Sequence, residues 1–396
     1  MHSIRNNLSF EFFESSKFAG GRCRSFYDKK IGIEIDNGNH LVFSANENFL
    51  NFCKFIGSKK TLKIISPNFG FYDLKKKKKW NLSLKESIYK LIFSHKKYLI
   101  PGTSIFDYFS FLKFLITNEN KSVFELVGKS AIYHTFWEPL TIGVMNTCPK
   151  YASARVLSNV LKKTIFKGKK FCHILQPSFN WNKTLIEPSS NFIKNSGNEI
   201  QFNSLLKKIE IRDDRVINLI FNNKRISVGE NDRVILCIPP TNLNKLLPDI
   251  ILPKDYNTIL NIHFKISKEN LSEFKKPIFG FINSISDWIF IKHNHISVTV
   301  SDANSLNIID QNKIANIVWN EICSYLGKKI NFLKFQIVRE KKATYHQSPK
   351  NFKLIKKLNN IPNNILLAGD WTQHNLPCTI EGSILSGKKA IEFLNN

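Results

Sequence analysis

Hydrophobic residues near the carboxyl end of the chain change from a continuous run to a helical stripe. Residues 365–368 are all apolar, which is typical of a short strand buried on both faces. Farther along, apolar or small residues fall on one face of a helix, at positions 380, 384, 387, 391 and 394. The pattern therefore predicts a buried strand, a turn and an amphipathic helix between residues 365 and 394.

The turn in this unit carries Gly369 and Asp370. An acidic residue at the carboxyl end of a buried strand lies where open α/β sheets bind ligands. The helix that follows contains Gly382 and Gly387, and each interior glycine costs a helix about 1 kcal/mol relative to alanine. The start of that helix presents free N–H groups, which suit a phosphate. These residues alone allow two interpretations: a ligand site, or a helix packed on a sheet beside an acidic turn.

The remaining apolar runs predict mixed strands and helices. Residues 8–13 are predicted to form a strand that ends at Glu14. Further strands, the first two as a hairpin and the next four as a meander, are predicted at residues 62–65, 70–74, 199–202, 208–211, 216–221 and 225–228. Later strands are predicted at 234–238, 259–266, 278–282, 288–292, 296–300 and 332–338. Helices are predicted at 152–161 and between a cap at Asp310 and a terminator at Gly327.

Residues 103–116 form an intensely aromatic segment with apolar residues on most sides. The segment is too short and too interrupted to span a bilayer. Two interpretations remain open: a helix buried in the core, or a wall of a lipid tunnel that dips into a membrane.

Composition narrows the classes of protein. A length of 396 residues suits two or three domains, and 42% hydrophobic residues allow a sizeable core. There is no window of 18 apolar residues and no apolar leader at the start, so we expect a cytoplasmic protein without a transmembrane helix. Seven cysteines are scattered singly, which fits free thiols in a reducing compartment and argues against a metal site or a disulfide framework.

The formal net charge of +27 raises the question of a nucleic-acid partner. Lysines are spread along the whole chain, and the one run, 75–79, has the setting of a solvated hairpin turn. We therefore expect no nucleic-acid binding, whereas a loose attraction to an acidic bilayer fits the charge, because each cation near such a surface contributes about 1 kcal/mol.

Two glycine-containing segments follow the first predicted strand. Gly20 and Gly21 precede Arg22, whose guanidinium can bind a phosphate through two hydrogen bonds. A second segment reads Asp-Asn-Gly-Asn-His over residues 36–40. Taken alone, the first segment could equally be a glycine turn followed by a surface arginine.

The motifs together resemble a known family. Ala-Gly-Asp-Trp-Thr at 368–372, followed by Leu-Pro-Cys-Thr-Ile-Glu-Gly at 376–382, resembles the closing motif of flavin-dependent desaturases and amine oxidases. Asp-Asn-Gly-Asn-His at 36–40 and Trp-Glu-Pro-Leu at 137–140 are similar to the squalene-associated branch, the hydroxysqualene dehydroxylases. The resemblance runs from residue 14 to residue 393, nearly the whole chain.

This resemblance implies an FAD site at numbered positions. Asp370 would bind the ribityl chain, and Thr379 and Ile380 would lie under the pyrophosphate and the flavin edge. Glu14 would hold the adenosine ribose and Arg22 the pyrophosphate. The other implied FAD-binding residues are Gly20, Gly21, Asn37, Gly38, Asn39 and His40, with Leu206 at the adenine and Gly369, Trp371, Leu376 and Pro377 beside Asp370. No metal is expected. Weak catalytic candidates are His40 and Glu138, each of which is more commonly structural.

The family also implies an architecture and an activity. The expected fold is α/β: a Rossmann-like FAD-binding domain from residues 1–60, 195–245 and 335–396, with a mixed α+β substrate-binding domain from 61–194 and 246–334. The implied activity is the reductive dehydroxylation of hydroxysqualene, a hydrophobic isoprenoid, with peripheral membrane association as a further expectation. The electron donor is not indicated. Alternatives are a carotenoid-type desaturase or amine oxidase on the same scaffold.

The sequence departs from the family pattern at one point. Dinucleotide-binding folds place a G-x-G-x-x-G turn roughly 20 residues before the acid that Glu14 represents. The first glycine of this sequence is Gly20, so we expect the first βα unit to be missing. The departure leaves two further interpretations open: a misassigned start codon, or a truncated polypeptide that serves as a non-catalytic remnant or scaffold.

Overall fold

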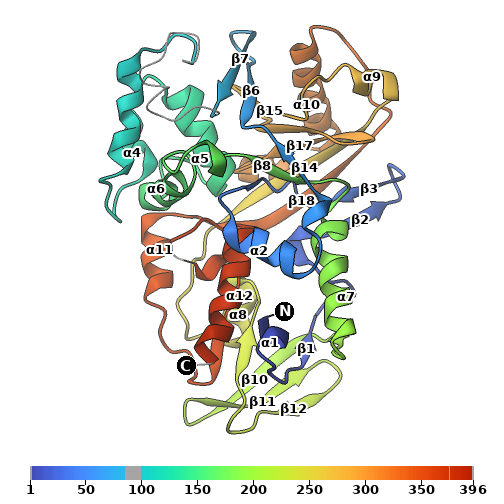
Figure 1. Cartoon of the computed structure of the whole chain (residues 1–396), viewed down its shortest axis with the longest axis vertical. Helices are drawn as coiled ribbons and strands as arrows, with labels where there is room; N and C mark the ends of the chain where they lie inside the picture. The colour runs from blue at the N-terminus through green and yellow to red at the C-terminus, as the bar shows by residue number, and fades with distance from the viewer. Residues whose placement is uncertain (1, 85–99, 374, 395–396) are drawn as a thin grey trace.

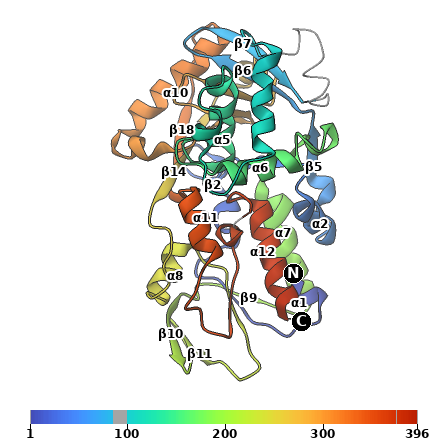
Figure 2. The same cartoon turned by 90° about the vertical axis from the view of Figure 1, so that its left-hand side faces the viewer.

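The computed structural model describes residues 2–84, 100–373 and 375–394 of the chain (Figure 1). One large sheet occupies the upper half of the view in Figure 1, and several small sheets and the long helix α12 (Ile380–Leu394) occupy the lower half. The short N-terminal helix α1 (His2–Arg5) lies beside α12, as both views show (Figure 2).

The large sheet has seven strands in the order β18-β14-β17-β16-β15-β6-β7, all antiparallel except the β15–β6 pair. In this order the strands are Lys334–Tyr345, Tyr256–Lys265, His295–Val300, Trp288–Ile291, Ile278–Ile282, Asn68–Asp73 and Lys78–Ser83. Alternate residues of β14 and β17, such as Leu260, Ile262 and Val298, pack with helix α10 (Gln311–Leu326) in an apolar cluster. Their neighbours Asn261, His263 and Ser297 are also buried, so the opposite face of this sheet is polar and covered.

The lower half holds short parallel strands. Strand β1 (Phe12–Phe13) pairs with β9 (Ile200–Gln201), and β13 (Val234–Leu236) pairs with β19 (Ile365–Leu367). An antiparallel meander joins β10 (Leu206–Arg212), β11 (Arg215–Phe221) and β12 (Arg225–Ser227). Two further small sheets lie nearer the large sheet in Figure 1: β2 (Ser25–Asp28) with β3 (Ile33–Asp36), and β4 (Val42–Phe43) with β8 (Ile174–Pro177) and β5 (Leu62–Ile65).

Helices cover these sheets. The α-helices not yet given are α2 (Glu47–Phe55), α4 (Val123–Val127), α5 (Glu138–Met145), α6 (Ala154–Lys163), α7 (Glu187–Asn195), α8 (Pro240–Leu246), α9 (Lys268–Ser272) and α11 (Pro349–Lys356). The 3-10 and π segments are η1 (Gly21–Cys23), η2 (Lys59–Thr61), η4 (Ile105–Phe114), η5 (Tyr133–Trp137), η6 (Lys169–Phe171), η7 (Asn182–Ile186), η8 (Ala303–Ile308) and η9 (Asp370–Thr372). Among the described residues, none of these helices has the length and apolar character to cross a membrane.

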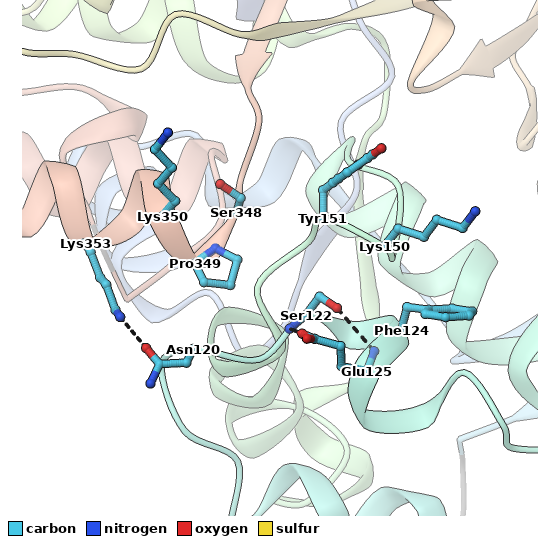
Figure 3. A pocket seen from close by; sticks show the side chains of 10 residues that line it. All are labelled: Asn120, Ser122, Phe124, Glu125, Lys150, Tyr151, Ser348, Pro349, Lys350 and Lys353. Atoms are coloured by element: carbon cyan, nitrogen blue, oxygen red, sulfur yellow. Dashed lines mark hydrogen bonds between the residues drawn. The ribbon is translucent and has the colours of Figure 1, made fainter.

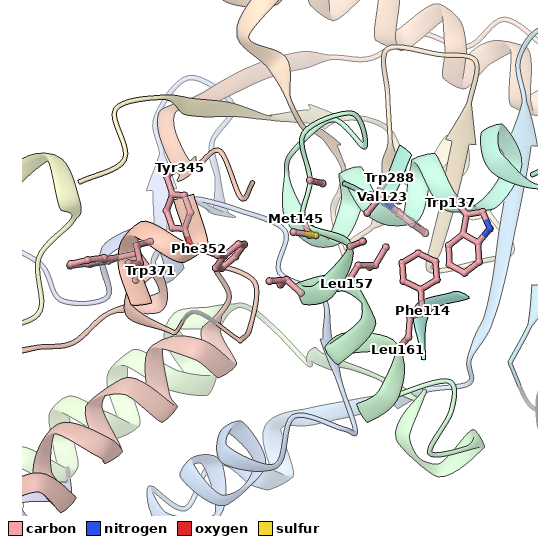
Figure 4. Close-up of a cluster of buried hydrophobic side chains, with 14 of the residues drawn as sticks. Phe114, Val123, Trp137, Met145, Leu157, Leu161, Trp288, Tyr345, Phe352 and Trp371 are labelled. Carbon is pink, nitrogen blue, oxygen red and sulfur yellow. The ribbon is translucent and has the colours of Figure 1, made fainter. Parts of the chain in front are cut away.

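A groove and a core cluster lie on the side where α4, α6 and α11 meet. The groove opens between α4 and α11 (Figure 3). The largest apolar cluster runs inward from Phe114 on η4 through Met145 and Leu157 to Tyr345 and Trp371 (Figure 4). One continuous core therefore links the aromatic segment near residue 110 with the closing motif.

Several strand predictions are wrong in pairing or extent. Strands β5 and β6 do not form a hairpin: β5 pairs with β8, while β6 pairs with β7 across the lysine-rich turn. Strand β9 is not part of the meander but pairs with β1, and β1 covers two residues rather than six. Pairing partners from distant parts of the sequence decide these cases, and local periodicity does not carry that information.

Other predictions are confirmed. The meander is present from β10 to β12, and 234–236 pairs in parallel with 365–367. Helix α10 begins after its cap Asp310 and ends at Gly327. The aromatic segment is helical, but as the 3-10 helix η4, with one side buried and one side exposed.

Candidate functional site

The centre of the candidate site is an ion pair between two residues that are 348 positions apart. Arg22 Nη2 lies 2.7 Å from Asp370 Oδ1, and Arg22 Nη1 donates to the backbone carbonyl of Ala343. The Asp370 side chain is only 9% exposed. Its carboxylate raises the pKa of Arg22 above the ordinary value. Two residues predicted to bind different parts of one cofactor therefore contact each other.

The turn that carries Asp370 is fixed from three sides. Strand β19 ends just before Gly369, whose N–H donates to Ser386 Oγ of α12 at 2.8 Å. The indole N–H of Trp371 donates to the carbonyl of Ile238 at 2.9 Å, beyond the end of β13. A Cβ on Gly369, with φ at +145°, would lie 2.9 Å from the Trp371 ring, so a larger residue is strained there.

The start of α12 lies directly against this turn. A Cβ on Gly382 would lie 3.4 Å from the carbonyl of Pro377 and 3.5 Å from that of Asp370, so this glycine permits close packing. Thr379 Oγ1 accepts from the Gly382 N–H at 3.3 Å. Among the described residues, the N–H groups of Ile380 and Glu381 have no protein acceptor. Leu376 and Pro377 are buried beside them.

The glycine turn brings Arg22 to this place. Gly20 and Gly21 have φ values of +105° and +52°, and a Cβ on Gly20 would lie 2.9 Å from Ile186. The carbonyl of Arg22 accepts from Asn37 Nδ2 at 3.3 Å and lies 3.3 Å from His40 Nε2. The two glycine-containing segments of the N-terminal region therefore meet at Arg22.

The segment 37–40 in turn lies on the polar face of the large sheet. Asn261 Nδ2 donates to the carbonyl of Asn37 at 3.1 Å. Asn39 Nδ2 donates to Ser297 Oγ at 2.7 Å and to Thr299 Oγ1 at 3.1 Å. Asn39 Oδ1 is buried and has no protein donor. Gly38 also lies close to this face: a Cβ built on it would lie 3.8 Å from Asn261 Nδ2.

Buried histidines lie at this junction. Burial lowers the pKa of His40 below the ordinary value, which favours the neutral imidazole. Burial also lowers the pKa of His263 to about 3, and that of His295, 3.3 Å away from it, well below the ordinary value. Lys292 forms an ion pair with the buried Asp36 at 3.2 Å beside them. The junction thus contains neutral histidines and one compensated charge pair.

Glu14 and Leu206 lie together but apart from the ion pair. The N–H of Ser204 donates to the carbonyl of Glu14 at 2.9 Å, which places the start of β10 beside the end of β1. Glu14 Oε1 accepts from the N–H of Ser16 at 2.8 Å. Among the described residues, no hydrogen bond joins Glu14 or Leu206 to Arg22 or Asp370. A ligand with two separated polar groups would be needed to contact both places.

Glu138 lies elsewhere. It starts α5, and its Oε2 lies 2.8 Å from Nδ1 of His134, whose side chain is 77% exposed. Burial raises the pKa of Tyr133 and of Cys148, and the negative charge of Glu138 raises both further. Among the described residues, no hydrogen bond or ion pair joins Glu138 to Arg22, Asp370 or His40.

The donor set fits a flavin dinucleotide. A guanidinium and two unpaired N–H groups at a helix start suit a pyrophosphate, and glycines beside both leave room for close approach. Within the described residues, Asp370 Oδ2 and the buried Asn39 Oδ1 accept no hydrogen bond from the protein, so they can accept from the hydroxyls of a ribityl chain and from the N–H groups of a ring. The residues present therefore fit FAD.

Three groups near Arg22, Asp370 and Asn39 were not predicted from the sequence. They are Ala343, whose carbonyl holds Arg22; Glu381, which accepts from the N–H groups of Asn48 and Phe49; and the polar sheet residues Asn261, Ser297 and Thr299. Polar residues do alternate with apolar ones along β14 and β17, but such alternation normally indicates a solvent-facing side. The alternation along β14 and β17 therefore did not distinguish a buried polar face from a solvent-facing one.

Comparison with known proteins gives matches over nearly the whole chain. Residues 4–125 and 183–391 match the family described as flavin containing amine oxidoreductase. A hydroxysqualene dehydroxylase of Zymomonas mobilis is 32% identical over 97% of this chain and 92% of its own length. One of Rhodopseudomonas palustris is 32% identical over 98% and 93%. A 15-cis-phytoene desaturase of Arabidopsis thaliana is 26% identical over 52% of this chain and 40% of its own length.

Solved structures show the same fold at low sequence identity. A putrescine oxidase bound to putrescine has a TM-score of 0.74 at 10% identity, covering 100% of this chain and 96% of its own. A cyclohexylamine oxidase of Brevibacterium oxydans has a TM-score of 0.70 at 9% identity, covering 99% and 94%.

Proposed function

Because the chain belongs to the flavin containing amine oxidoreductase family, we propose that it is an FAD-dependent enzyme that reductively removes the hydroxyl group of hydroxysqualene to give squalene. One observation carries the proposal: the similarity to hydroxysqualene dehydroxylases extends over nearly the entire length of both chains. The family, the flavin cofactor and the α/β fold predicted from the sequence are confirmed by these matches.

We assign the cofactor contacts as the sequence predicts them. Arg22 and the start of α12 hold the pyrophosphate, Asp370 the ribityl chain and Glu14 the adenosine ribose, with the backbone of Leu206 at the adenine. Residues 37–40 run beside the flavin ring. The Arg22–Asp370 contact, the contact of Arg22 with Asn37 and the unpaired acceptor on Asn39 support this order.

The division into two interleaved domains is part of the proposal. The segments 1–60, 195–245 and 335–396 would hold the cofactor, and 61–194 and 246–334 the substrate. Backbone pairing supports the first set: β1 with β9 joins its first and second segments, and β13 with β19 joins its second and third.

Bound reduced flavin supplies a hydride to the carbon that loses the hydroxyl group. The chain's part is to exclude water, orient the isoprenoid and provide a proton for the departing oxygen. The apolar cluster that includes Tyr345 and Trp371 supplies a dry surface beside Asp370 (Figure 4). His40, whose pKa burial lowers, acts as a neutral hydrogen-bonding group at the Arg22 carbonyl rather than as a charged acid. Glu138 stays the predicted candidate for the acid.

The substrate class also bears on location. A long isoprenoid dissolves in the apolar interior of a bilayer, so the enzyme would collect its substrate at a membrane surface as a peripheral protein.

The test is an anaerobic assay of the purified FAD-loaded protein. Hydroxysqualene is added with dithionite-reduced FAD, and squalene is measured by gas chromatography with mass detection. We expect squalene only when protein and reduced flavin are both present. Protein that retains FAD yet leaves hydroxysqualene unchanged would contradict the proposal.

A second candidate is a carotenoid-type desaturase on the same scaffold. The partial match to phytoene desaturase favours it. Phytoene replaces hydroxysqualene in the same assay, now with oxidised FAD and a quinone acceptor. New conjugated double bonds, read from the visible spectrum, would favour this activity over dehydroxylation.

A further inference from the structure

The aromatic helix η4 has a period of three. Its polar residues are Asp107, Ser110 and Lys113, with two apolar residues between successive ones. A 3-10 helix has 3.0 residues per turn, so every third residue faces the same side. The sequence pattern and this geometry together produce three straight rows of side chains along one ten-residue helix.

The rows differ in environment. The inner row, Tyr108, Phe111 and Phe114, is buried and belongs to the core cluster that reaches Trp371 (Figure 4). The outer row is exposed: Phe106 by 79%, Phe109 by 46%, Leu112 by 46% and Leu115 by 43%, followed by Ile116 at 87%. At a rise of about 2.0 Å per residue, this outer row is about 18 Å long. An apolar row of this size on a surface marks an interaction site.

Three lysines line the groove beside η4. The groove has a volume of about 580 Å³ between α4 and α11, and its walls carry Lys150, Lys350 and Lys353 (Figure 3). Lys353 donates to Asn120. In the described part of the chain, no carboxylate lies within 4.0 Å of Lys150 or Lys350. The exposed rings of Phe124 and Tyr151 stand at the same groove.

The acidic residues nearby are already engaged. Asp107 accepts from the N–H of Ser104 at 2.7 Å, and Glu125 accepts from the N–H of Ser122 at 2.6 Å, each as a helix cap. Glu119 forms an ion pair with Lys356 at 3.1 Å. The groove is therefore lined by three lysines and one carboxylate, Glu125, so its lining carries net positive charge.

The elements that carry both features lie on the same side of the molecule. Figure 1 shows α4 and α11 on its left-hand side, and η4 contacts α4. We propose that the outer row of η4 and the lysines of the adjacent groove dock this protein on the surface of an anionic lipid bilayer. The inference rests on the proposed function, because a substrate dissolved in lipid gives the enzyme a reason to be there.

An exposed apolar row next to lysines favours an anionic bilayer as the binding partner. The apolar row enters the boundary between headgroups and acyl chains, while the ammonium groups face anionic headgroups. The inner row of the same helix begins the apolar cluster that ends at Trp371, beside Asp370. Docking through η4 would therefore place a continuous apolar core between the bilayer and the candidate flavin site.

Flotation of the full-length FAD-loaded protein with vesicles tests the inference. One set of vesicles is pure phosphatidylcholine and the other contains about one-third phosphatidylglycerol. We expect at least about tenfold stronger binding to the anionic set, which weakens when the salt concentration is raised. Phe106→Ser with Ile116→Ser, and separately Lys150→Glu with Lys350→Glu, should each reduce binding at least about tenfold.

Matched variants outside η4 and the groove serve as controls. Ile308→Ser with Ile64→Ser removes two exposed apolar side chains elsewhere, and Lys268→Glu with Lys313→Glu makes the same charge change on α9 and α10. Both should bind as the natural chain does. Equal loss in test and control variants, or no vesicle binding by folded, FAD-loaded protein, would overturn the inference. So would a dimer, seen by sedimentation, that the Phe106→Ser, Ile116→Ser variant dissociates. Vesicle binding is measured without turnover. A negative result would therefore count against this docking surface and not against the proposed activity.

Discussion

The large sheet and the small parallel sheets are held together in different ways. Strands β14 and β18 pair over nine registered positions, so the backbone itself fixes the upper half of the molecule. In the lower half, β1 pairs with β9 over two positions and β13 with β19 over three. A few backbone bonds flank these pairings, such as the one from the Ser204 N–H to the Glu14 carbonyl. Side chains add further links, such as buried Asn364, which exchanges two hydrogen bonds with the backbone of Val216.

The difference teaches where single side chains matter most. A long strand pairing distributes its stability over many hydrogen bonds. Strands that pair over only two residues are held in place by a few contacts. Arg22, Asp370 and Glu381 each join segments more than 300 residues apart. The proposed cofactor region should therefore be sensitive to single substitutions that the large sheet tolerates.

The largest effect is expected at Asp370. Asp370→Asn removes the charge that pairs with Arg22 and weakens their hydrogen bond, which is worth about 1.5–3 kcal/mol when charged. We expect FAD to bind about tenfold to hundredfold more weakly, measured by fluorescence titration of the released flavin.

Asp73→Asn is the matched control in the other region. Asp73 is a buried aspartate of β6, and its Oδ1 accepts from the N–H of Lys76 and from Asn283. The change should leave flavin affinity within about twofold, because an Asn oxygen accepts the same two bonds. Normal flavin affinity in Asp370→Asn would show that the site is misplaced, and equal losses in both variants would remove the contrast between the regions.

Glu381 should come next. Its carboxylate accepts from the backbone N–H groups of Asn48 and Phe49 at 3.2 and 2.9 Å, and so caps α2 from another helix. Glu381→Ala leaves these donors unpaired near the start of α2, which should lower the free energy of unfolding by about 1–3 kcal/mol. Urea titration followed by circular dichroism measures it.

Glu392→Ala, at the other end of the same helix, provides the comparison. Glu392 is half exposed and forms an ion pair with Lys388 one turn away, at 3.4 Å. Its loss should change the unfolding free energy by less than about 0.5 kcal/mol. A similar small change in Glu381→Ala would mean that cross-links between distant segments do not hold the lower half.

The sequence predicts these two regions unequally. The strand, turn and helix around Asp370 were predictable because the signal is local: an apolar run, a glycine and a helical stripe. The pairing of β5 with β8 was not, since its partner lies more than 100 residues away and periodicity says nothing about partners. The buried polar face was missed for a physical reason. Asn261 and His263 alternate with apolar residues as a solvent-facing side would, but Asn261 contacts the backbone of Asn37 and His263 contacts His295, so both are buried in the folded chain.

The smallest effect at neutral pH is expected at His263, on that covered face. Burial lowers its pKa in the folded protein to about 3, below the unfolded value near 6.5, so below pH 6.5 the unfolded chain binds a proton that the folded chain does not. Stability should therefore fall as pH decreases through this window, by up to about 1.4 kcal/mol per pH unit for one group. His263→Gln should make the profile of unfolding free energy against pH shallower.

Asp287 should change the pH dependence of the unfolding free energy in the opposite direction. Burial raises its pKa to about 7, so the folded protein holds a proton that the unfolded chain releases above about pH 4, and its contribution is lost as pH rises toward 7. Asp287→Asn should therefore make the acid side of the profile steeper, while His263→Gln makes it shallower. Urea titrations at intervals between pH 4 and 7 measure both slopes. If both variants kept the natural slope, the histidine would be hydrated, and the polar face of the large sheet would not be sealed by residues 37–40.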